Sequence, residues 1–151
     1  MVKIIESSLF DAREDIICHQ VNCQGVMGAG LAKEIVKRYP MVKERYVRLC
    51  RAASEPADLL GRVQLIEIGS ERFIANIFGQ LYYGRDELRR YTSYSALKSA
   101  FIQIRQRYSE YSLAFPFGFG CGLANGDWSV VAELIQTYLG NMNVSIYRYD
   151  C

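Results

Sequence analysis

Residues 16–38 read IICHQVNCQGVMGAGLAKEIVKR and carry the strongest structural signal in the chain. The first part, Ile16–Asn22, is apolar and β-branched at its start, which predicts a strand. Glycines then gather over Gly25–Gly30, and from Leu31 onward apolar residues recur at helical spacing. The stretch therefore predicts a strand, a glycine-rich loop and a helix in direct succession.

The rest of the chain alternates the same two patterns. Apolar runs predict strands at Val2–Glu6, Arg62–Ile68, Arg72–Phe78, Ser112–Phe115 and Val144–Tyr149. Helical spacing predicts helices at Val42–Ala53, Ser93–Tyr108 and Val130–Leu139, and Gly69-Ser70 predicts a hairpin turn. Strands that alternate with helices indicate an α/β layered fold with a mixed sheet. A length of 151 residues without a linker or repeat suits a single domain over residues 1–151.

The composition narrows the class of protein. The chain is 50% hydrophobic and 23% charged, which excludes a disordered tail and a small disulfide scaffold. Its net charge of +2 argues against broad electrostatic capture of nucleic acid or acidic membranes. The 5 cysteines, with no secretory leader and no membrane-length apolar run, predict free thiols and a cytoplasmic location.

The first glycine-rich loop is suited to an anion. Because it runs into a helix, its backbone N–H groups can meet a negative charge at a helix N-terminus. It is not a Walker loop, since Leu31-Ala32 stands where Lys-Ser/Thr belongs, and Gly28-Ala29-Gly30 lacks the third glycine of a dinucleotide fingerprint. Tight turns and helix packing are the alternative explanation of these glycines.

A second glycine-rich stretch, PFGFGCGLANGDW over residues 116–128, follows the predicted strand Ser112–Phe115. A run of N–H groups from Gly118 to Leu123 would form an anion-binding nest. In layered α/β folds, ligands bind beyond the carboxyl ends of the strands. We therefore expect the two loops to line one crevice.

Two segments resemble the ligand loops of macro domains: VNCQGVMGAGLAKEI over residues 21–35 and PFGFGCGL over residues 116–123. Within the family they are similar to the branch of ADP-ribose 1″-phosphate phosphatases and terminal ADP-ribose protein glycohydrolases, near which antitoxin macro domains also lie. The resemblance implies a three-layer α/β/α sandwich with a central mixed sheet and an ADP-ribose site. The ligand-binding residues that it implies are Ser8, Leu9, Asn22, Gly28, Ala29, Gly30, Leu31, Ala32, Pro116, Gly118, Phe119, Gly120, Cys121, Gly122 and Leu123.

The resemblance also implies two catalytic residues, His19 and Asp127. In phosphatase-like members, a histidine occupies the place of His19 and is implicated in catalysis. A neutral imidazole there would accept a proton from water or donate a hydrogen bond to the terminal phosphate. An acidic residue at the place of Asp127 is linked to catalysis, and Asn22 matches the asparagine that holds the distal ribose. The alternatives are a hydrogen-bonded strand histidine, a helix N-cap aspartate and an ordinary turn asparagine.

Cysteine and metal chemistry are not expected. Cys121 lies in the nest, but no arginine follows six residues later, and a small loop residue is the alternative explanation. Cys18 and His19 point to opposite faces of the predicted strand, so they do not converge with Cys23 on a metal ion. We assign no metal and no cofactor.

The chain departs from the glycohydrolase members of the family at two places, and from many macro domains at a third. Their catalytic lysine follows the strand matched by Arg72–Phe78, where this chain has Gly79-Gln80-Leu81. Their aspartate after the Gly-Leu of the second loop is replaced by Ala124. Ser8 stands where many macro domains carry an adenine-binding aspartate.

The leading hypothesis is an ADP-ribose-binding macro domain that hydrolyses an ADP-ribose derivative, with ADP-ribose 1″-phosphate as the preferred substrate. A non-catalytic ADP-ribose reader would need only the two loops. A third hypothesis is removal of ADP-ribose from protein or nucleic acid without the lysine, in which case Arg85, Arg89 and Arg90 would contact the larger target. We expect a monomer with no membrane partner.

Overall fold

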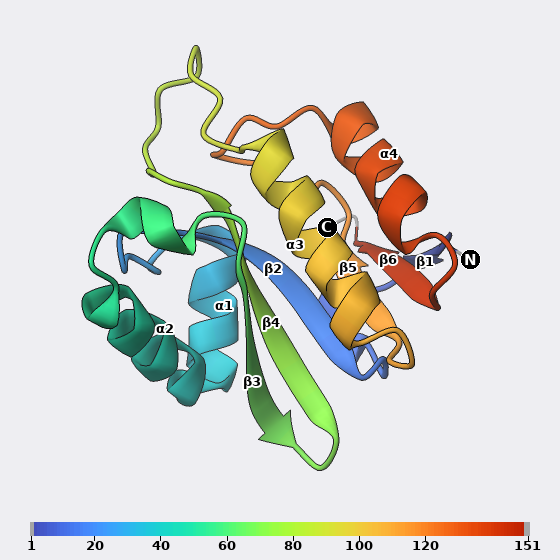
Figure 1. Ribbon diagram of the computed structural model, residues 1–151. Coiled ribbons are helices and arrows are strands. Elements are labelled where there is room, and N and C mark those ends of the chain that lie inside the picture. Colours follow the sequence, from blue (N-terminus) through green and yellow to red (C-terminus); the bar gives the residue numbers. More distant parts are fainter. Residues whose placement is uncertain (1, 150–151) are drawn as a thin grey trace.

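The computed structural model describes residues 2–149, in which one mixed sheet lies between two pairs of helices (Figure 1). Its strands are β1 (Val2–Glu6), β2 (Ile16–Asn22), β3 (Val63–Gly69), β4 (Arg72–Gln80), β5 (Leu113–Pro116) and β6 (Val144–Arg148). Their order across the sheet is β1-β6-β5-β2-β4-β3. Neighbouring strands are parallel except for the pair β3 and β4, so the predicted mixed sheet is confirmed.

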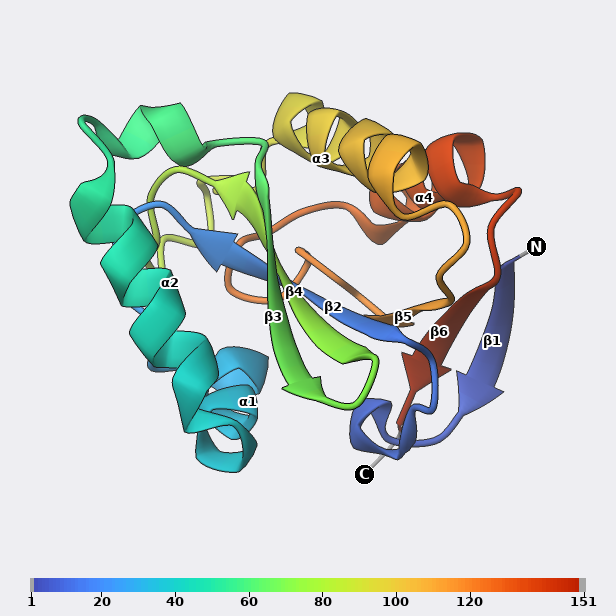
Figure 2. The same cartoon turned by 60° about the horizontal axis from the view of Figure 1, so that its bottom comes forward.

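The helices form the outer layers. Helices α1 (Gly30–Arg38) and α2 (Pro40–Ala52) cover one face of the sheet, and α3 (Tyr94–Arg107) and α4 (Trp128–Leu139) cover the other (Figure 2). Successive residues of β2 point into opposite layers, because side chains alternate along a strand. Ile17 and Val21 pack toward α1 and α2, whereas Ile16 and Cys18 pack toward α3 and α4. The predicted three-layer α/β/α sandwich is confirmed.

The structure moves several predicted boundaries. The β3–β4 turn consists of Ser70 and Glu71, one residue later than predicted, and Glu71 adopts a positive φ of 54°. Helix α2 begins at Pro40, because proline suits the first turn of a helix, where no N–H partner is needed. Two 3₁₀ helices were not predicted, η1 (Leu9–Asp11) and η2 (Pro56–Leu59).

The topology places both glycine-rich loops at one point of the sheet. Strands β2 and β5 are parallel neighbours, so their carboxyl ends lie side by side. The chain leaves β2 toward α1 on one face and leaves β5 toward α4 on the other. A crevice forms where consecutive connections diverge in this way, and it is the usual ligand position in layered α/β folds.

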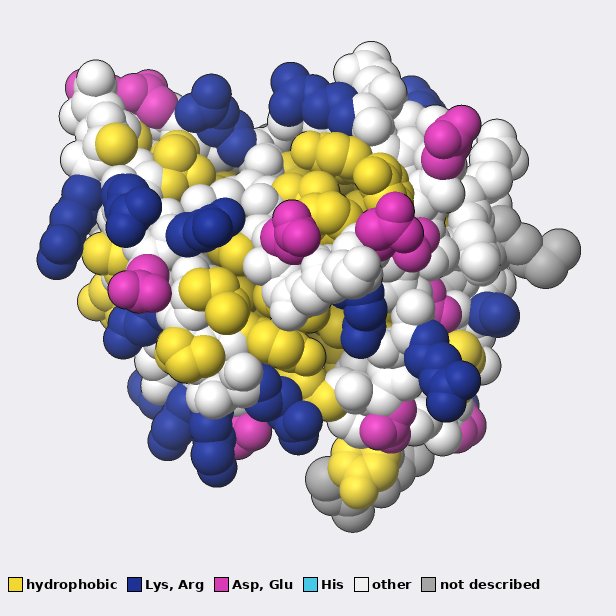
Figure 3. Space-filling model, turned by 90° about the horizontal axis from the view of Figure 1, so that it is seen from below, with side chains coloured by type: hydrophobic (Ala, Val, Ile, Leu, Met, Phe, Trp, Pro, Cys, Tyr) yellow, Lys and Arg dark blue, Asp and Glu magenta, His cyan; other side chains and the backbone are white. Residues whose placement is uncertain are grey.

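Charge is unevenly distributed over the surface. Helices α1 and α2 carry two acidic side chains, Glu34 and Glu44, against the basic set Lys33, Lys37, Arg38, Lys43, Arg45, Arg48 and Arg51. Figure 3 shows Lys and Arg side chains gathered on the side of the molecule where these helices lie. Within residues 2–149, no helix combines the length and the apolar character needed to cross a membrane.

Candidate functional site

A pocket of about 810 Å³ opens where β2, β4 and β5 end. Its volume is in the range that holds a ligand of nucleotide size. Most of the predicted site residues line it: His19, Asn22, Gly28, Ala29, Gly30, Leu31, Ala32, Pro116, Gly118, Phe119, Gly120, Gly122 and Leu123. The two glycine-rich loops therefore share one pocket, as their positions after parallel strands predict.

The first loop leaves the N-terminus of α1 open toward the pocket. Gly30, the first residue of α1, has a positive φ of 56°, and no side chain caps the helix at Ala29. By contrast, the hydroxyl of Ser93 caps α3 and the carboxylate of Asp127 caps α4. The first N–H groups of α1 are thus available to an anion in the pocket.

Asn22 and Tyr46 hold the first loop in shape. The Asn22 amide donates to the Val26 carbonyl (2.8 Å), and its oxygen accepts from the Gln24 N–H (2.9 Å). The buried Tyr46 hydroxyl, from α2, lies 2.8 Å from the same Asn22 oxygen and 2.7 Å from the Asn22 carbonyl. Sequence reasoning missed Tyr46, because only the packing of α2 brings it to the loop. Asn22 keeps one amide N–H that no protein group occupies in the described residues.

The second loop is shaped by glycines that a side chain would disrupt. Gly118 and Gly120 have positive φ values of 78° and 74°. A Cβ on Gly126 would lie 2.5 Å from the Gly120 carbonyl oxygen, which accepts from the Gly126 N–H (2.9 Å) and the Thr92 hydroxyl (2.5 Å). A Cβ on Gly120 would lie 2.9 Å from the side-chain oxygen of Gln20. Close backbone packing therefore requires glycine at Gly126, and the positive φ values favour glycine at Gly118 and Gly120.

His19 is buried in the wall of the pocket, with 2% of its surface exposed. Its Nε2 is hydrogen-bonded to Asn76 Oδ1 (2.5 Å), and its Nδ1 has no partner among the described residues. Burial lowers the pKa of His19 to about 4, and the hydrogen bond with Asn76 offsets part of that shift. The imidazole is therefore neutral at physiological pH.

The exceptions among the predicted site residues are Ser8, Leu9, Cys121 and Asp127, none of which lines the pocket. The Ser8 hydroxyl accepts from the Phe10 N–H and caps η1, while Leu9 is buried in the core beneath it. The Cys121 thiol turns toward the Phe119 carbonyl. The structure thus gives these three residues local structural contacts.

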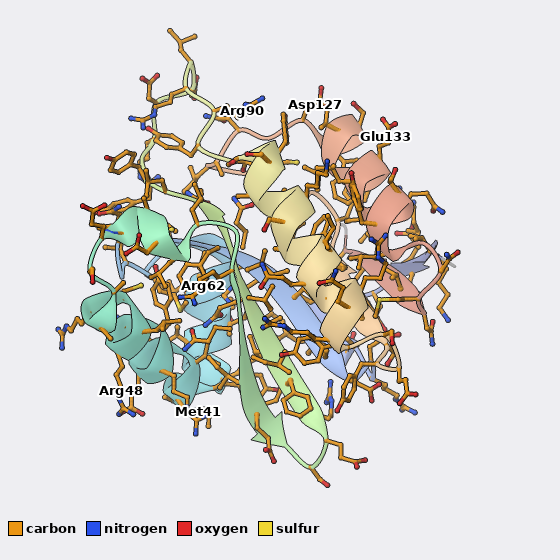
Figure 4. All side chains as sticks on the ribbon, in the orientation of Figure 1. Met41, Arg48, Arg62, Arg90, Asp127 and Glu133 are labelled. Atoms are coloured by element: carbon orange, nitrogen blue, oxygen red, sulfur yellow. The ribbon has the colours of Figure 1, made fainter. Side chains whose placement is uncertain are left out.

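Asp127 lies at the N-terminal end of α4 (Figure 4) and does not belong to the pocket lining. Its carboxylate accepts from the Ser129 hydroxyl (2.7 Å) and the Ser129 N–H (2.9 Å). These hydrogen bonds hold the pKa of Asp127 below its usual range, and the bond from the Ser129 hydroxyl has the larger effect. The contacts are those of a helix N-cap, the alternative that the sequence left open.

Thiol and metal chemistry receive no support in residues 2–149. Cys18, Cys23, Cys50 and Cys121 are free thiols, and burial raises the pKa of each, to about 11 for Cys121 and about 12 for Cys23. Such thiols are protonated at neutral pH and are poor nucleophiles. The predicted free thiol Cys151 lies outside the described residues. No group of three potential metal ligands among His, Cys, Asp and Glu occurs in that part of the chain.

Several lining residues were not among the predicted ligand residues: Gln20, Val21, Val26, Met27, Gln80, Tyr83, Gly84, Arg85, Phe117 and Ala124. Gln80 belongs to the segment Gly79–Leu81, where the resemblance would put a lysine, and Ala124 stands where it would put an aspartate. Gln80 instead accepts a hydrogen bond from Gln20 (2.8 Å). Arg85 is the one charged side chain in the lining drawn from residues 2–149.

Residues 81–92 form a long loop at the edge of the pocket, and the second glycine-rich loop anchors it. Asn125, with a positive φ of 60°, donates from its amide to the carbonyls of Asp86 (3.0 Å) and Arg89 (2.8 Å). The N–H groups of Tyr91 and Thr92 donate to the Ala124 carbonyl (2.8 and 3.1 Å). The pocket wall contributed by the loop thus depends on a segment more than thirty residues later in the chain.

Comparison with known proteins gives several distant relatives, although no family model matches the chain. The chain is 25% identical over 164 residues to a DNA ADP-ribosyl transferase–DNA ADP-ribosyl glycohydrolase fusion protein of Thermosipho africanus, covering 98% of the chain and 41% of the relative. It is 37% identical over 67 residues to an ADP-ribose 1″-phosphate phosphatase of Meyerozyma guilliermondii, and the match covers 42% of the chain and 38% of the relative. A Saccharomyces cerevisiae phosphatase of the same name is 22% identical, and the match covers 88% of the chain and 89% of the relative. The chain thus spans about two fifths of the first two relatives.

Solved structures share the fold along the whole chain. A protein of unknown function from Bacteroides thetaiotaomicron superposes with a TM-score of 0.84 at 22% identity, covering 98% of both chains. A macrodomain protein from Streptomyces coelicolor gives 0.77 at 25% identity, covering 100% of this chain and 99% of that one. Thermosipho africanus DarTG, solved in complex with ADP-ribose, gives a TM-score of 0.79 at 22% identity, and the superposition covers 97% of this chain and 41% of that one.

Proposed function

We propose that the chain is a macro domain that binds ADP-ribose in the pocket between the two glycine-rich loops. The observation that carries the proposal is the pairing of an uncapped helix N-terminus at Gly30 with the glycine-shaped loop from Gly118 to Leu123 in one pocket. Aligned backbone dipoles of this kind bind phosphate groups without a cluster of lysines. This accounts for an anion site in a chain whose net charge is only +2.

The rim of the pocket suits the remaining parts of the ligand. Phe117 is 41% exposed and Tyr83 is 53% exposed, so both rings can contact adenine or a ribose. The Phe117 ring also packs against Trp128, with the ring centroids 4.8 Å apart. Arg85 supplies the positive side chain of the lining. Asn22 and the residues from Gly28 to Ala32 would then lie against the distal ribose, with the diphosphate at the second loop.

Calorimetry with ADP-ribose tests binding through a matched pair of substitutions. Leu123 lines the pocket and is 50% exposed, so Leu123→Asp adds a carboxylate beside the diphosphate without opening the core. We expect about a tenfold or greater loss of affinity, because like charges repel in a partly desolvated site. Leu88 is 99% exposed and lies outside the lining, so Leu88→Asp should bind as the unchanged protein does. Equal affinities of the two variants would contradict the proposed site.

We further propose that the domain hydrolyses ADP-ribose 1″-phosphate, with His19 as the proton acceptor. Water would attack the phosphorus and pass a proton to the imidazole as the bond to the 1″ oxygen breaks. That oxygen would take a proton from solvent water, and the imidazolium would return its proton to the solvent. ADP-ribose and inorganic phosphate are the products. His19 supports this chemistry because it is neutral, lines the pocket and keeps one nitrogen unpartnered.

Phosphorus NMR of the protein with ADP-ribose 1″-phosphate tests the hydrolysis. Growth of an inorganic phosphate signal is expected, and His19→Ala should slow it about 100-fold. Shifted diphosphate resonances without phosphate release would instead establish a reader. The reader is the second candidate because Asp127, the other predicted catalytic residue, caps α4 outside the pocket.

A further inference from the structure

Three polar side chains form a continuous row across the sheet, starting from the pocket wall. His19, Asn76 and Gln64 lie opposite one another on β2, β4 and β3. All three point toward α1 and α2, on the face that carries Ile17, Ile74 and Ile66. His19 Nε2 is bonded to Asn76 Oδ1, Asn76 Nδ2 donates to Gln64 Oε1 (3.1 Å), and Gln64 Nε2 donates to the Arg45 carbonyl of α2 (3.1 Å).

The far end of the row fixes its direction. The Arg45 carbonyl can only accept, so Gln64 must turn its NH₂ group toward α2 and its oxygen toward Asn76. Asn76 must then present its NH₂ group to Gln64 and its oxygen to His19. An amide oxygen accepts but does not donate, so His19 Nε2 must carry the hydrogen. Each link follows from the one before it.

The second ring nitrogen of His19 is therefore an acceptor. A neutral imidazole carries a single hydrogen, and with that hydrogen on Nε2 the lone pair of Nδ1 is free. Within residues 2–149 nothing donates to Nδ1, although His19 is almost fully buried. A buried acceptor without a donor destabilises the fold. Nδ1 exposes less than 1 Å² of surface in this structure, so an O–H group in the pocket reaches it when the ring or its neighbours shift on ligand binding.

We propose that Asn76 and Gln64 are positioning residues, which hold His19 as the Nε2–H tautomer so that Nδ1 accepts a hydrogen bond from an O–H group in the pocket. This inference rests on the proposed function, because it deepens the role of His19 in the ADP-ribose pocket. Of the two roles that the sequence left open for a neutral imidazole, it selects acceptance of a proton from an O–H group and excludes donation to a phosphate. Neither Asn76 nor Gln64 lines the pocket, so both act through His19.

The chain offers a direct test because His19 is its only histidine. Protein labelled with ¹⁵N in histidine gives one imidazole spin system, in which the hydrogen-bearing and bare nitrogens have well separated chemical shifts. At pH 7 we expect Nε2 to show the hydrogen-bearing shift and Nδ1 the bare one. The reverse assignment would overturn the proposal, whether or not the protein binds ADP-ribose.

Variants of Gln64 test whether the row sets the tautomer. In Gln64→Leu the Asn76 amide is no longer anchored and can turn its NH₂ group toward Nε2, so a second signal with the hydrogen on Nδ1 is expected. Gln64→Glu still presents an oxygen to Asn76 and should keep the single Nε2–H signal. Gln103→Leu is the matched control, because Gln103 also donates to a backbone carbonyl, that of Gly61 (2.8 Å), but has no link to His19. A single unchanged signal in Gln64→Leu would overturn the positioning role.

Addition of ADP-ribose identifies the O–H group. If a ribose hydroxyl donates to His19, the Nδ1 resonance shifts on binding while Nε2 keeps its hydrogen. If Nδ1 keeps its shift in the complex, no ligand hydroxyl reaches it, and its proposed role as an acceptor in the pocket is overturned. A hydrogen on Nδ1 in the complex would overturn the proposal. Failure of ADP-ribose to bind by calorimetry would count against the proposed function, and the tautomer of the free protein would still be decided.

Discussion

His19 shows how much the surroundings of one residue decide its chemistry. An unburied imidazole gains a proton near pH 6.5, but this one lies among apolar side chains with a single amide as its partner. Burial and the Asn76 hydrogen bond are the recorded influences on its pKa, and burial is the larger. The residue is therefore held neutral across the physiological range, which suits a hydrogen-bond acceptor.

The same burial should make folding stability depend on pH. Since the pKa of His19 is about 4 in the folded state and about 6.5 in the unfolded state, the unfolded chain binds more protons between those values. Stability should be full above pH 6.5 and fall as the pH drops toward 4, by roughly 3 kcal/mol for this group. Urea unfolding at pH 7 and pH 4.5 measures the effect.

His19→Asn serves as the reference for that measurement. Asparagine can still donate to Asn76 but does not titrate, so its stability should change less between the two pH values than that of the unchanged protein. Carboxyl groups elsewhere contribute equally to both proteins and cancel in the comparison. An identical pH dependence in both would show that His19 is not buried as a neutral group.

Among the elements, α1 differs from the other helices in its N-terminus. Helix α2 starts with Pro40, and α3 and α4 start at the side-chain caps Ser93 and Asp127. The N-cap of α1 is Ala29, and this helix has neither a proline in its first turn nor a side-chain cap. It is also the helix whose first turn lines the pocket. A stabilising cap is missing where backbone N–H groups are needed for a ligand.

Ala29→Asp should therefore raise the stability of the fold and lower its affinity for the ligand. An aspartate at this N-cap would accept from the first N–H groups and stabilise the fold by about 1 kcal/mol. It would also place a negative charge where the ligand approaches, so affinity for ADP-ribose 1″-phosphate should fall about tenfold. Thermal unfolding and calorimetry measure the two effects. Ala29→Ser supplies the cap without the charge, and equal binding by both variants would argue against an anion at this helix end.

The molecule as a whole builds its pocket from segments that lie far apart in the sequence. The loops after β2 and β5 meet because those strands are neighbours in the sheet. Residues 81–92 join them because Asn125 ties that loop to the second glycine-rich loop. The pocket is thus held together by tertiary contacts between loops that are distant in the sequence.

Loss of the Asn125 amide should loosen the 81–92 loop. Asn125→Gly keeps the positive φ of 60° accessible but removes both hydrogen bonds to the loop carbonyls. Local opening should increase about tenfold, and tryptic cleavage at Arg85, Arg89 and Arg90, which are exposed, should accelerate accordingly. Asn141→Gly, in the turn after α4, is the control substitution. Equal cleavage rates in the two variants would mean that Asn125 does not anchor the loop.

The sequence by itself determined the strand–loop–helix units, the mixed α/β sheet and the meeting of the two glycine-rich loops. These features are local or follow from topology. Apolar periodicity indicates which residues are buried, and glycine indicates where the backbone can adopt unusual conformations. Parallel strands have their carboxyl ends at the same edge of the sheet. The same reasoning placed His19 and Val21 on one face of β2, as the structure has them.

Tertiary structure alone decided which side chains reach the pocket and in what chemical state. Tyr46 meets Asn22 through the packing of α2, and Asp127 turns to cap its own helix rather than face the pocket. The hydrogen on His19 is placed by Arg45, whose carbonyl lies at the other end of the row. Hydrogen-bond direction and burial depend on partners that are distant in sequence, and no local pattern along the chain records them.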